Sequence, residues 1–153
     1  MSHTGFHKIT LRRAEDTDSK LIWHWRNDSV TRANFRNNQL ISWPTHRDWY
    51  AEAIKDPDRL MLIGEQDGTP FGIVRFDKML GGAYEVSINV APEWRGIGLG
   101  CKLLGLACQR ANKKLFATIK ESNTASQRIF ILNGFERLNT ADGYIYFSRE
   151  PNS

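Results

Sequence analysis

Three glycines occupy alternate positions in the stretch APEWRGIGLG, which spans residues 91–100. Glycine loses more backbone freedom on folding than any other residue, so this density indicates a need for bare backbone. An alternating run precedes the stretch and a leucine-rich run follows it, which predicts a turn between a strand and a helix. A helix N-terminus binds phosphate oxygens through its free N–H groups and partial positive charge. Gly96, Gly98 and Gly100 therefore favour an anion site, with a tight turn that binds no ligand as the alternative.

The spacing of these glycines separates the turn from two familiar phosphate loops. The P-loop has Lys-Ser or Lys-Thr after its last glycine, whereas Cys101 and Lys102 follow Gly100. The Rossmann turn has two residues between its second and third glycines, but only Leu99 lies between Gly98 and Gly100. We therefore expect neither a P-loop nor a dinucleotide site, and we expect Lys102 to be a solvated surface residue.

The strand that leads into the turn carries a candidate for acid–base chemistry. In AYEVSINV, residues 83–90, alternation places Glu85, Ser87 and Asn89 on one face and apolar residues on the other. A carboxylate beside a ligand turn can take a proton from a nucleophile, directly or through water. Glu85 is therefore a candidate general base, with a solvated strand glutamate as the alternative.

Aromatic and cationic side chains are concentrated between residues 21 and 49. Four of the five tryptophans and several guanidinium and amide groups lie here: Trp23, Trp25, Trp43, Trp49, Arg26, Asn27, Arg32 and Asn34. Aromatic faces beside guanidinium groups suit stacking on a base or sugar and bidentate contact with phosphate. The alternative is that the aromatic residues, Trp25 and Trp49 above all, belong to the core. His46, near the start of a predicted helix, is either a ligand contact or a structural residue.

The elements that must position these residues follow the order β-α-α-β-β-β-α-β-α-β-β. Hydrophobic patterning predicts strands at 7–14, 59–66, 70–79, 83–90, 115–120, 135–140 and 143–149. Apolar positions at helical spacing predict helices at 16–28, 42–56, 99–114 and 123–134, with a short irregular or helical piece at 29–40. The fold class is therefore α/β (α+β) with a mixed central sheet, and we expect one domain over residues 8–149.

Local signals predict how several of these elements begin, turn and end. We expect Asp16 to be the N-cap of the first helix and Gly134 to end the last one. Asp67-Gly68 predicts a two-residue hairpin. The strand at 115–120 is predicted to be buried on both faces, because it is a short apolar run.

Composition argues against several classes of partner and location. The chain has 153 residues, a net charge of +4 and a pI near 9.2, but Lys and Arg are interleaved with acids along its length. We therefore expect no nucleic-acid partner. We also expect a cytoplasmic location without a membrane partner, because no apolar run can cross a bilayer and the N-terminus lacks a secretion signal. Cys101 and Cys108, two helical turns and roughly 10 Å apart, are too distant for a disulfide. We expect no metal site.

Two motifs resemble the GCN5-related N-acetyltransferase (GNAT) superfamily. RGIGLG, residues 95–100, is similar to its Arg/Gln-x-x-Gly-x-Gly/Ala signature. Downstream, its Asn-x-x-Ala/Ser-x-x-x-Tyr/Phe-x-x-x-Gly-Phe helix is matched by Asn123, Ser126, Phe130, Gly134 and Phe135. The resemblance implies the GNAT fold and direct transfer of an acetyl group from acetyl-CoA to a primary amine, with Glu85 as the base.

The same resemblance implies a set of cofactor-binding residues. The pyrophosphate of acetyl-CoA would be held by the backbone of Arg95, Gly96, Ile97, Gly98, Leu99 and Gly100. The pantetheine arm would pair with the backbone of Ile88, Asn89 and Val90 as an added strand. Asn123, Ser126 and Phe130 would line the other wall. The family often has tyrosine where this chain has Phe130, and because phenylalanine has no proton to give, we expect solvent to protonate the leaving thiolate. Tyr144 and Tyr146 are other donors, although wall packing is the simpler reading for them.

A narrower resemblance concerns the acceptor. The segments WRND and TR, then IS and HRDW, look like the N-acetyltransferases of pseudaminic- and legionaminic-type pathways, which modify nucleotide-linked amino sugars. This resemblance implies a UDP-linked 4-amino-4,6-dideoxy sugar as acceptor, contacted by Arg26, Asn27, Arg32 and His46. Peptide N-terminal, aminoglycoside and polyamine acetyltransferases are alternatives, as is a non-catalytic acetyl-CoA-binding module. A homodimer is a further expectation.

Overall fold

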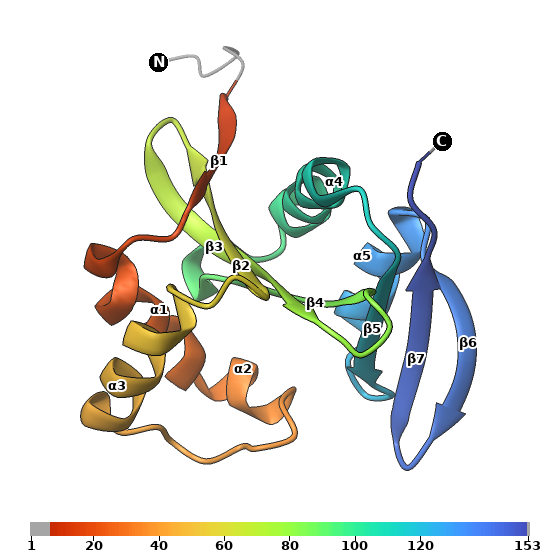
Figure 1. The fold of residues 1–153 in the computed structure, drawn as a ribbon, viewed down its shortest axis with the longest axis horizontal. Helices are drawn as coiled ribbons and strands as arrows, with labels where there is room; N and C mark the ends of the chain where they lie inside the picture. Colours follow the sequence, from red (N-terminus) through yellow and green to blue (C-terminus); the bar gives the residue numbers. More distant parts are fainter. Residues whose placement is uncertain (1–6, 153) are drawn as a thin grey trace.

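A seven-stranded sheet in the order β1-β2-β3-β4-β5-β7-β6 runs through the computed structural model, which describes residues 7–152 (Figure 1). The strands are β1 (Ile9–Arg13), β2 (Arg59–Gln66), β3 (Thr69–Lys78), β4 (Tyr84–Val90), β5 (Leu115–Lys120), β6 (Glu136–Ala141) and β7 (Tyr144–Arg149). Only β4 and β5 pair in parallel, and every other neighbouring pair is antiparallel. The mixed sheet and the predicted element order are therefore confirmed.

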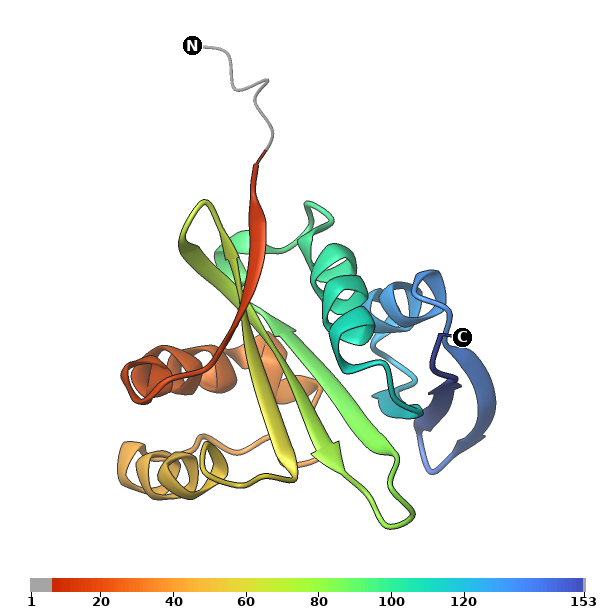
Figure 2. The same cartoon turned by 45° about the horizontal axis from the view of Figure 1, so that its top comes forward.

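Helices cover both faces of this sheet (Figure 2). On one face lie α1 (Ser19–Asn27), α2 (Ser29–Ala33) and α3 (Trp43–Ala53), and on the other α4 (Leu99–Ala111) and α5 (Thr124–Leu132). Two short 3₁₀ turns, Asp16–Asp18 and Pro92–Trp94, complete the elements. Among the described residues, none of the helices combines the length and apolar character needed to span a membrane.

The alternation of the central strands supplies a hydrophobic core on each face. Leu62 and Val74 belong to the core under α4 and α5, whereas Ile63 and Ile73 belong to the core under α1 and α3. Each successive side chain of a strand points to the opposite face, so the consecutive apolar residues in the middle of β2 and β3 fill both cores.

Local signals set most element ends as predicted, and two expectations are wrong. Asp67 and Gly68 both have positive φ in the hairpin between β2 and β3, and Gly134 has φ +84 after α5. Asp16 is not the N-cap of α1, because it begins a 3₁₀ turn and Asp18 is the residue that precedes α1. The Asp18 carboxylate accepts a hydrogen bond from the Glu15 N–H at 2.7 Å. Asp18 is held there from outside the helix by Arg12 of β1, at 2.7 and 2.8 Å.

The strand β5 is buried on one face only, which corrects the second expectation. Leu115, Ala117 and Ile119 are buried against α4 and α5, whereas Phe116 and Thr118 are half-exposed on the other face. The helices α1 to α3 cover the half of the sheet made by β2, β3 and β4 and leave this part of the far face open (Figures 1 and 2).

The sheet divides between β4 and β5. The two strands pair only at Tyr84 with Leu115 and at Glu85 with Phe116. Beyond Glu85 they diverge, although β4 stays paired with β3 over all of residues 84–90 (Figure 1). The edge of β4 that faces β5 therefore carries backbone N–H and C=O groups without a strand partner, at residues 86–90.

Candidate active site

The glycine turn combines an open surface with a helix N-terminus. Gly98 is the N-cap of α4 with φ +83, and Gly96 has φ +81. A Cβ added to either glycine would meet nothing within 4 Å, so the surface above them is open. Glycine is required at these two positions because of their positive φ, which other residues rarely adopt. At Gly100 the reason differs, because a Cβ there would lie 3.1 Å from Cδ1 of Ile129 on α5.

The turn forms one end of a cleft of about 660 Å³, called the glycine cleft here. Its walls come from the end of β4, the start of α5 and α2, and they include Ile88, Asn89, Val90, Asn123 and Ser126. The structure thus brings together most residues that the sequence assigned to a cofactor. Asn123 is also the N-cap of α5, because its side chain accepts a hydrogen bond from the Ser126 N–H. The Ile97 side chain is exposed, so we expect only the backbone of Ile97 to contact a cofactor.

The side chain of Arg95 turns away from the glycine cleft. Its guanidinium group donates to the Asp28 carboxylate at 2.9 Å, to the Thr31 hydroxyl at 2.8 Å and to the Val90 carbonyl at 3.1 Å. Asp28 is the N-cap of α2, so Arg95 fixes this short helix to the turn. The backbone of Arg95, and not its guanidinium group, is what remains available to a ligand.

A second, central cleft of about 320 Å³ lies where β4 and β5 diverge. Glu85 lies in its wall, and its Oε2 accepts a hydrogen bond from the Thr118 hydroxyl of β5 at 3.3 Å. Phe130 also lines this cleft, but its ring is buried and packs edge-on against Phe135 with centroids 4.8 Å apart. Asn123 and Ser126 are shared with the glycine cleft, so the two clefts are continuous.

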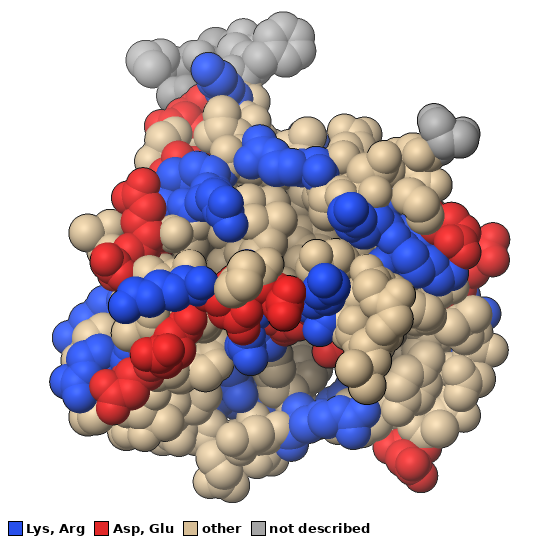
Figure 3. All heavy atoms as spheres, viewed as in Figure 1, with Lys and Arg blue, Asp and Glu red and all other residues tan. Residues whose placement is uncertain are grey.

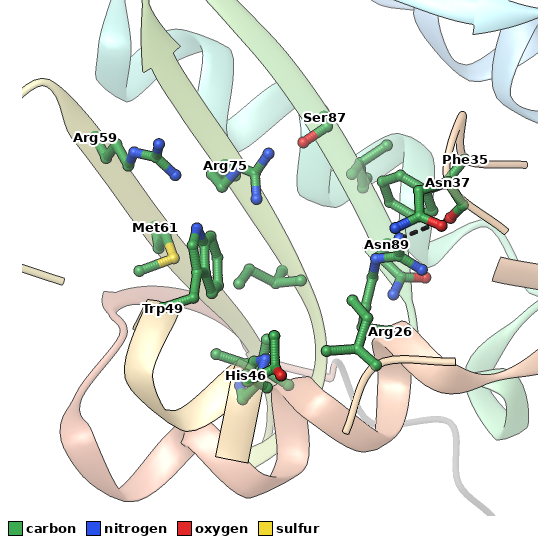
Figure 4. A pocket seen from close by; sticks show the side chains of 15 residues that line it. Arg26, Phe35, Asn37, His46, Trp49, Arg59, Met61, Arg75, Ser87 and Asn89 are labelled. Atoms are coloured by element: carbon green, nitrogen blue, oxygen red, sulfur yellow. Dashed lines mark hydrogen bonds between the residues drawn. The ribbon is translucent and has the colours of Figure 1, made fainter. Parts of the chain in front are cut away.

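A third cleft of about 560 Å³ opens on the face covered by α1 and α3 (Figure 4). This cleft, called the arginine cleft here, is lined by three arginines: Arg26, Arg59 and Arg75. No Asp or Glu among residues 7–152 lines it. Arg59 and Arg75 extend toward the indole of Trp49, with guanidinium carbons 5.8 and 5.5 Å from its centroid. Trp49, expected in the core, is therefore half-exposed in a cleft wall. Arg26 and Arg75 also line the central cleft, so all three clefts form a series.

Arg26 lies across the arginine cleft from Trp49 and lacks a carboxylate partner (Figure 4). It stacks on Phe35 at 4.2 Å and donates to the Asn37 carbonyl at 3.0 Å, while its Nη1 is buried without a partner among the described residues. Burial, and then the nearby charges of Arg75 and Arg32, lower the pKa of Arg26 from its ordinary value. A buried cation of this kind is stabilised by an anion.

His46 lines the same cleft in a fixed tautomer. Its Nε2 lies 2.9 Å from the Ser19 carbonyl, which can only accept, so Nε2 carries the proton. Its ring stacks between Trp43 and Tyr50, with centroids 5.9 and 5.6 Å away. Burial lowers the pKa of His46, and the Ser19 hydrogen bond offsets part of this effect.

Two residues expected to contact the acceptor lie outside the three clefts. The Asn27 amide donates to the Ile41 carbonyl at 2.8 Å and accepts from its N–H at 2.9 Å. Arg32 donates to the carbonyls of Asn27 and Asn38, both at 3.1 Å. Both side chains therefore hold the loop between α2 and α3, which forms part of the cleft walls. In their place the structure adds Arg59 of β2 and Arg75 of β3, which no local pattern of the sequence distinguishes from other surface arginines.

Outside the three clefts, three features bear on other possible functions: surface charge, metal ligands and thiols. On the face shown in Figure 3, Lys and Arg alternate with Asp and Glu and form no continuous basic stripe. Within residues 7–152, no three His, Cys, Asp or Glu side chains are grouped as metal ligands. Cys101 and Cys108 are free thiols.

Sequence comparison now decides the family. A model of the Acetyltransferase (GNAT) family matches residues 20–135, which include the glycine turn, Glu85 and the start of α5. The chain belongs to this family. It is therefore an acetyl-CoA-dependent N-acetyltransferase, and the GNAT fold expected from the two motifs is confirmed. No curated protein matches the sequence of this acetyltransferase significantly.

Solved structures agree with the fold of this acetyltransferase. A spermidine N-acetyltransferase SpeG chimera from Vibrio cholerae and hSSAT has a TM-score of 0.80 at 17% identity, covering 93% of this chain and 95% of that one. Aminoglycoside acetyltransferase AAC(6')-Ib with coenzyme A and kanamycin has a TM-score of 0.79 at 21% identity, covering 94% and 95%. The yncA structure from Salmonella typhimurium with acetyl-CoA has a TM-score of 0.75 at 23% identity, covering 95% of each chain.

Proposed function

We propose that this acetyltransferase, as a single domain over residues 8–149, acetylates the 4-amino group of a UDP-linked amino-deoxy sugar. The observation that carries the proposal is the arginine cleft, whose lining has three guanidinium groups and no carboxylate. Arg59 and Arg75 are paired with Asp77 outside the lining, which leaves Arg26 as the cation without a carboxylate partner among the described residues. A cationic acceptor such as a polyamine would require carboxylates there, whereas a diphosphate suits arginine. The half-exposed indole of Trp49 adds a face for a sugar or a base.

The glycine cleft fits acetyl-CoA, which supplies the acetyl thioester when bound. The backbone of residues 95–100 would hold its pyrophosphate, because α4 begins there and the surface above Gly96 and Gly98 is open. The edge of β4 at Ile88, Asn89 and Val90 lacks a strand partner on the β5 side and would pair with the pantetheine amides. Asn123 and Ser126 would form the opposite wall, and Phe130 would contact the cofactor where it enters the central cleft.

Glu85 would take a proton from the acceptor amine, directly or through water. An amine is protonated near neutral pH and attacks a carbonyl only as the neutral base, so proton removal precedes attack. Glu85 stands in the central cleft, which is continuous with the glycine cleft on one side and the arginine cleft on the other. A carboxylate at this junction supports direct transfer without an acetylated enzyme.

An acceptor panel tests the proposal. Release of free thiol from acetyl-CoA would be measured with a UDP-linked 4-amino sugar, the same sugar without its nucleotide, spermidine, kanamycin and a peptide with a free N-terminus. We expect the UDP-linked sugar to give the highest kcat/KM. A preference for spermidine or kanamycin, or for the peptide, would overturn the proposed acceptor.

Two arginine substitutions test whether the arginine cleft binds an anion. Arg26→Gln should raise the KM for the acceptor about tenfold or more, because a charge-assisted hydrogen bond to an anion is lost. Its KM for acetyl-CoA should stay near the wild-type value. Arg47→Gln is the matched control, since Arg47 is an exposed arginine of α3 paired with Asp48 outside the clefts. Equal effects of the two substitutions would count against an anion site at Arg26.

A further inference from the structure

Acetyl transfer leaves a proton requirement that the residues discussed so far do not meet. When the amine has formed its bond to the acetyl carbon, the carbon–sulfur bond breaks and the electron pair remains on sulfur. A donor that protonates this sulfur favours its departure. Glu85 is assigned to the amine, and Phe130 carries no exchangeable proton.

The lining of the central cleft narrows the choice of donor. Besides Glu85, its polar side chains are guanidinium, amide, hydroxyl and phenol groups: Arg26, Arg36, Arg75, Asn34, Asn37, Asn123, Ser87, Ser126, Thr118 and Tyr144. Guanidinium groups hold their protons too tightly, and amides and aliphatic hydroxyls are weaker acids still. Phenols and alkyl thiols have ordinary pKa values of about 10 and about 8.5, which is the close match that proton transfer needs.

Tyr144 is held in this cleft by its pairing with β5 and by a cation from the loop after α2. It is the first residue of β7 and lies opposite Lys120 of β5. The guanidinium group of Arg36, from the loop after α2, lies 4.1 Å from the centre of its ring. A cation over an aromatic ring interacts favourably with it, so Arg36 holds the ring of Tyr144 in place.

Tyr146, on the same strand, differs from Tyr144 because it does not line the central cleft. It shares the face of Tyr144, since residues two apart on a strand point the same way. Its hydroxyl lies 3.5 Å from Nη2 of Arg36, and it is not part of the lining of the central cleft. Arg36 therefore engages both tyrosines, but only Tyr144 lines the central cleft together with Glu85.

We propose that Tyr144 is the proton donor to the leaving sulfur and that Arg36 is a residue that positions it. Tyr144 gives its phenolic proton to the sulfur as the carbon–sulfur bond breaks, and the phenolate regains a proton from solvent. Glu85 receives the proton of the amine. Among the described residues, the charged groups that line the central cleft are three cations and this one carboxylate: Arg26, Arg36, Arg75 and Glu85. Arg75 is also paired with Asp77 at 2.9 Å. The net positive charge of these groups favours a thiolate in the cleft.

Binding of free coenzyme A tests this role without turnover. Calorimetry would compare coenzyme A with desulfo-coenzyme A between about pH 7 and about pH 9, the range in which the thiol begins to ionise. A phenol that donates to the sulfur stabilises the thiolate, so coenzyme A should gain affinity relative to the desulfo analogue as the pH rises. We expect a gain of about tenfold for the wild type, the size of one hydrogen bond to a charged group.

Tyr144→Phe and Tyr146→Phe form the matched pair of variants. Both keep the ring and its packing and remove one hydroxyl from β7. We expect Tyr144→Phe to lose the relative gain in affinity while binding desulfo-coenzyme A like the wild type, and Tyr146→Phe to keep the gain. The same pH-dependent gain in Tyr144→Phe as in the wild type would overturn the proposal. So would its loss in Tyr146→Phe alone.

Discussion

Nη1 of Arg95 lies 2.9 Å from Oδ2 of Asp28, which ties the first residue of the glycine turn to the N-cap of α2. The same guanidinium group donates to Thr31, whose hydroxyl is 3.1 Å from the Asn89 side chain on β4. One side chain therefore joins the turn, a cleft wall and the strand edge. Two of these three parts are assigned to acetyl-CoA.

Arg95→Gln is expected to weaken coenzyme A binding about tenfold and to lower the free energy of unfolding by roughly 2 kcal/mol, because charge-assisted hydrogen bonds are lost. Calorimetry and urea unfolding measure the two effects. Asp28→Asn is the graded control, since asparagine can still cap α2 and should weaken binding less. Unchanged affinity in Arg95→Gln would show that this network does not support the cleft.

Gly98→Ala and Gly68→Ala separate backbone strain from ligand binding. Both glycines have positive φ, +83 and +85, and an added Cβ at either meets nothing within 4 Å. Each substitution should cost about 1 kcal/mol of stability, because alanine is strained in this conformation. Only Gly98→Ala should also weaken coenzyme A binding, by roughly tenfold or more, since Gly68 lies in the hairpin between β2 and β3. Equal binding by the two variants would remove the glycine turn from the cofactor site.

Glu85→Gln is expected to lower kcat about 100-fold near neutral pH, the usual size of a general-base effect. The deficit should shrink as the pH approaches the pKa of the acceptor amine, because the amine then loses its proton without help. Stopped assays of acetylated product over a pH series would measure this. Glu136→Gln, at an exposed carboxylate of β6, is the control and should match the wild type. An undiminished rate for Glu85→Gln at neutral pH would refute the base assignment.

His46 should make stability depend on pH just below the ordinary histidine pKa of about 6.5. Its pKa is lowered in the folded protein, so between the folded and unfolded pKa values the unfolded chain binds more protons. The free energy of unfolding contributed by His46 is therefore full above about pH 6.5 and falls as the pH decreases. In His46→Gln, the amide can still donate to the Ser19 carbonyl, and this decrease should disappear. Urea unfolding at several pH values compares the two proteins, whose other histidines are identical. A difference that does not vary with pH would contradict the prediction.

Signals contained within a few residues were the ones that sequence could predict. The hairpin at Asp67-Gly68, the end of α5 at Gly134 and the turn before α4 each depend on a local backbone conformation. Asp16 failed as an N-cap because residues 16–18 form a separate 3₁₀ turn, so α1 begins only after Asp18, whose carboxylate is also bound by Arg12 of β1. A contact between separate elements of this kind leaves no local pattern.

The candidate site divides along the same line. The cofactor wall was predictable because its residues form two short motifs, and the structure gathers most of them around one cleft. The acceptor wall was not predictable, because it depends on which polar side chains hydrogen-bond to the loop after α2 and which remain free to line the cleft. Asn27 and Arg32 hold that loop, whereas Arg59 and Arg75, from β2 and β3, line the cleft. Only packing between distant segments separates these two pairs.

The division between β4 and β5 has a mechanical consequence. The two halves of the sheet are joined along this seam by two residue pairs, so the seam is its weakest line. An extended ligand that bridges the unpaired edge would act as a brace between the halves. Occupancy would then be visible without turnover, as slower hydrogen exchange of amides in residues 86–90 and a higher melting temperature. Bound acetyl-CoA would then stabilise the sheet as well as supply the acetyl group.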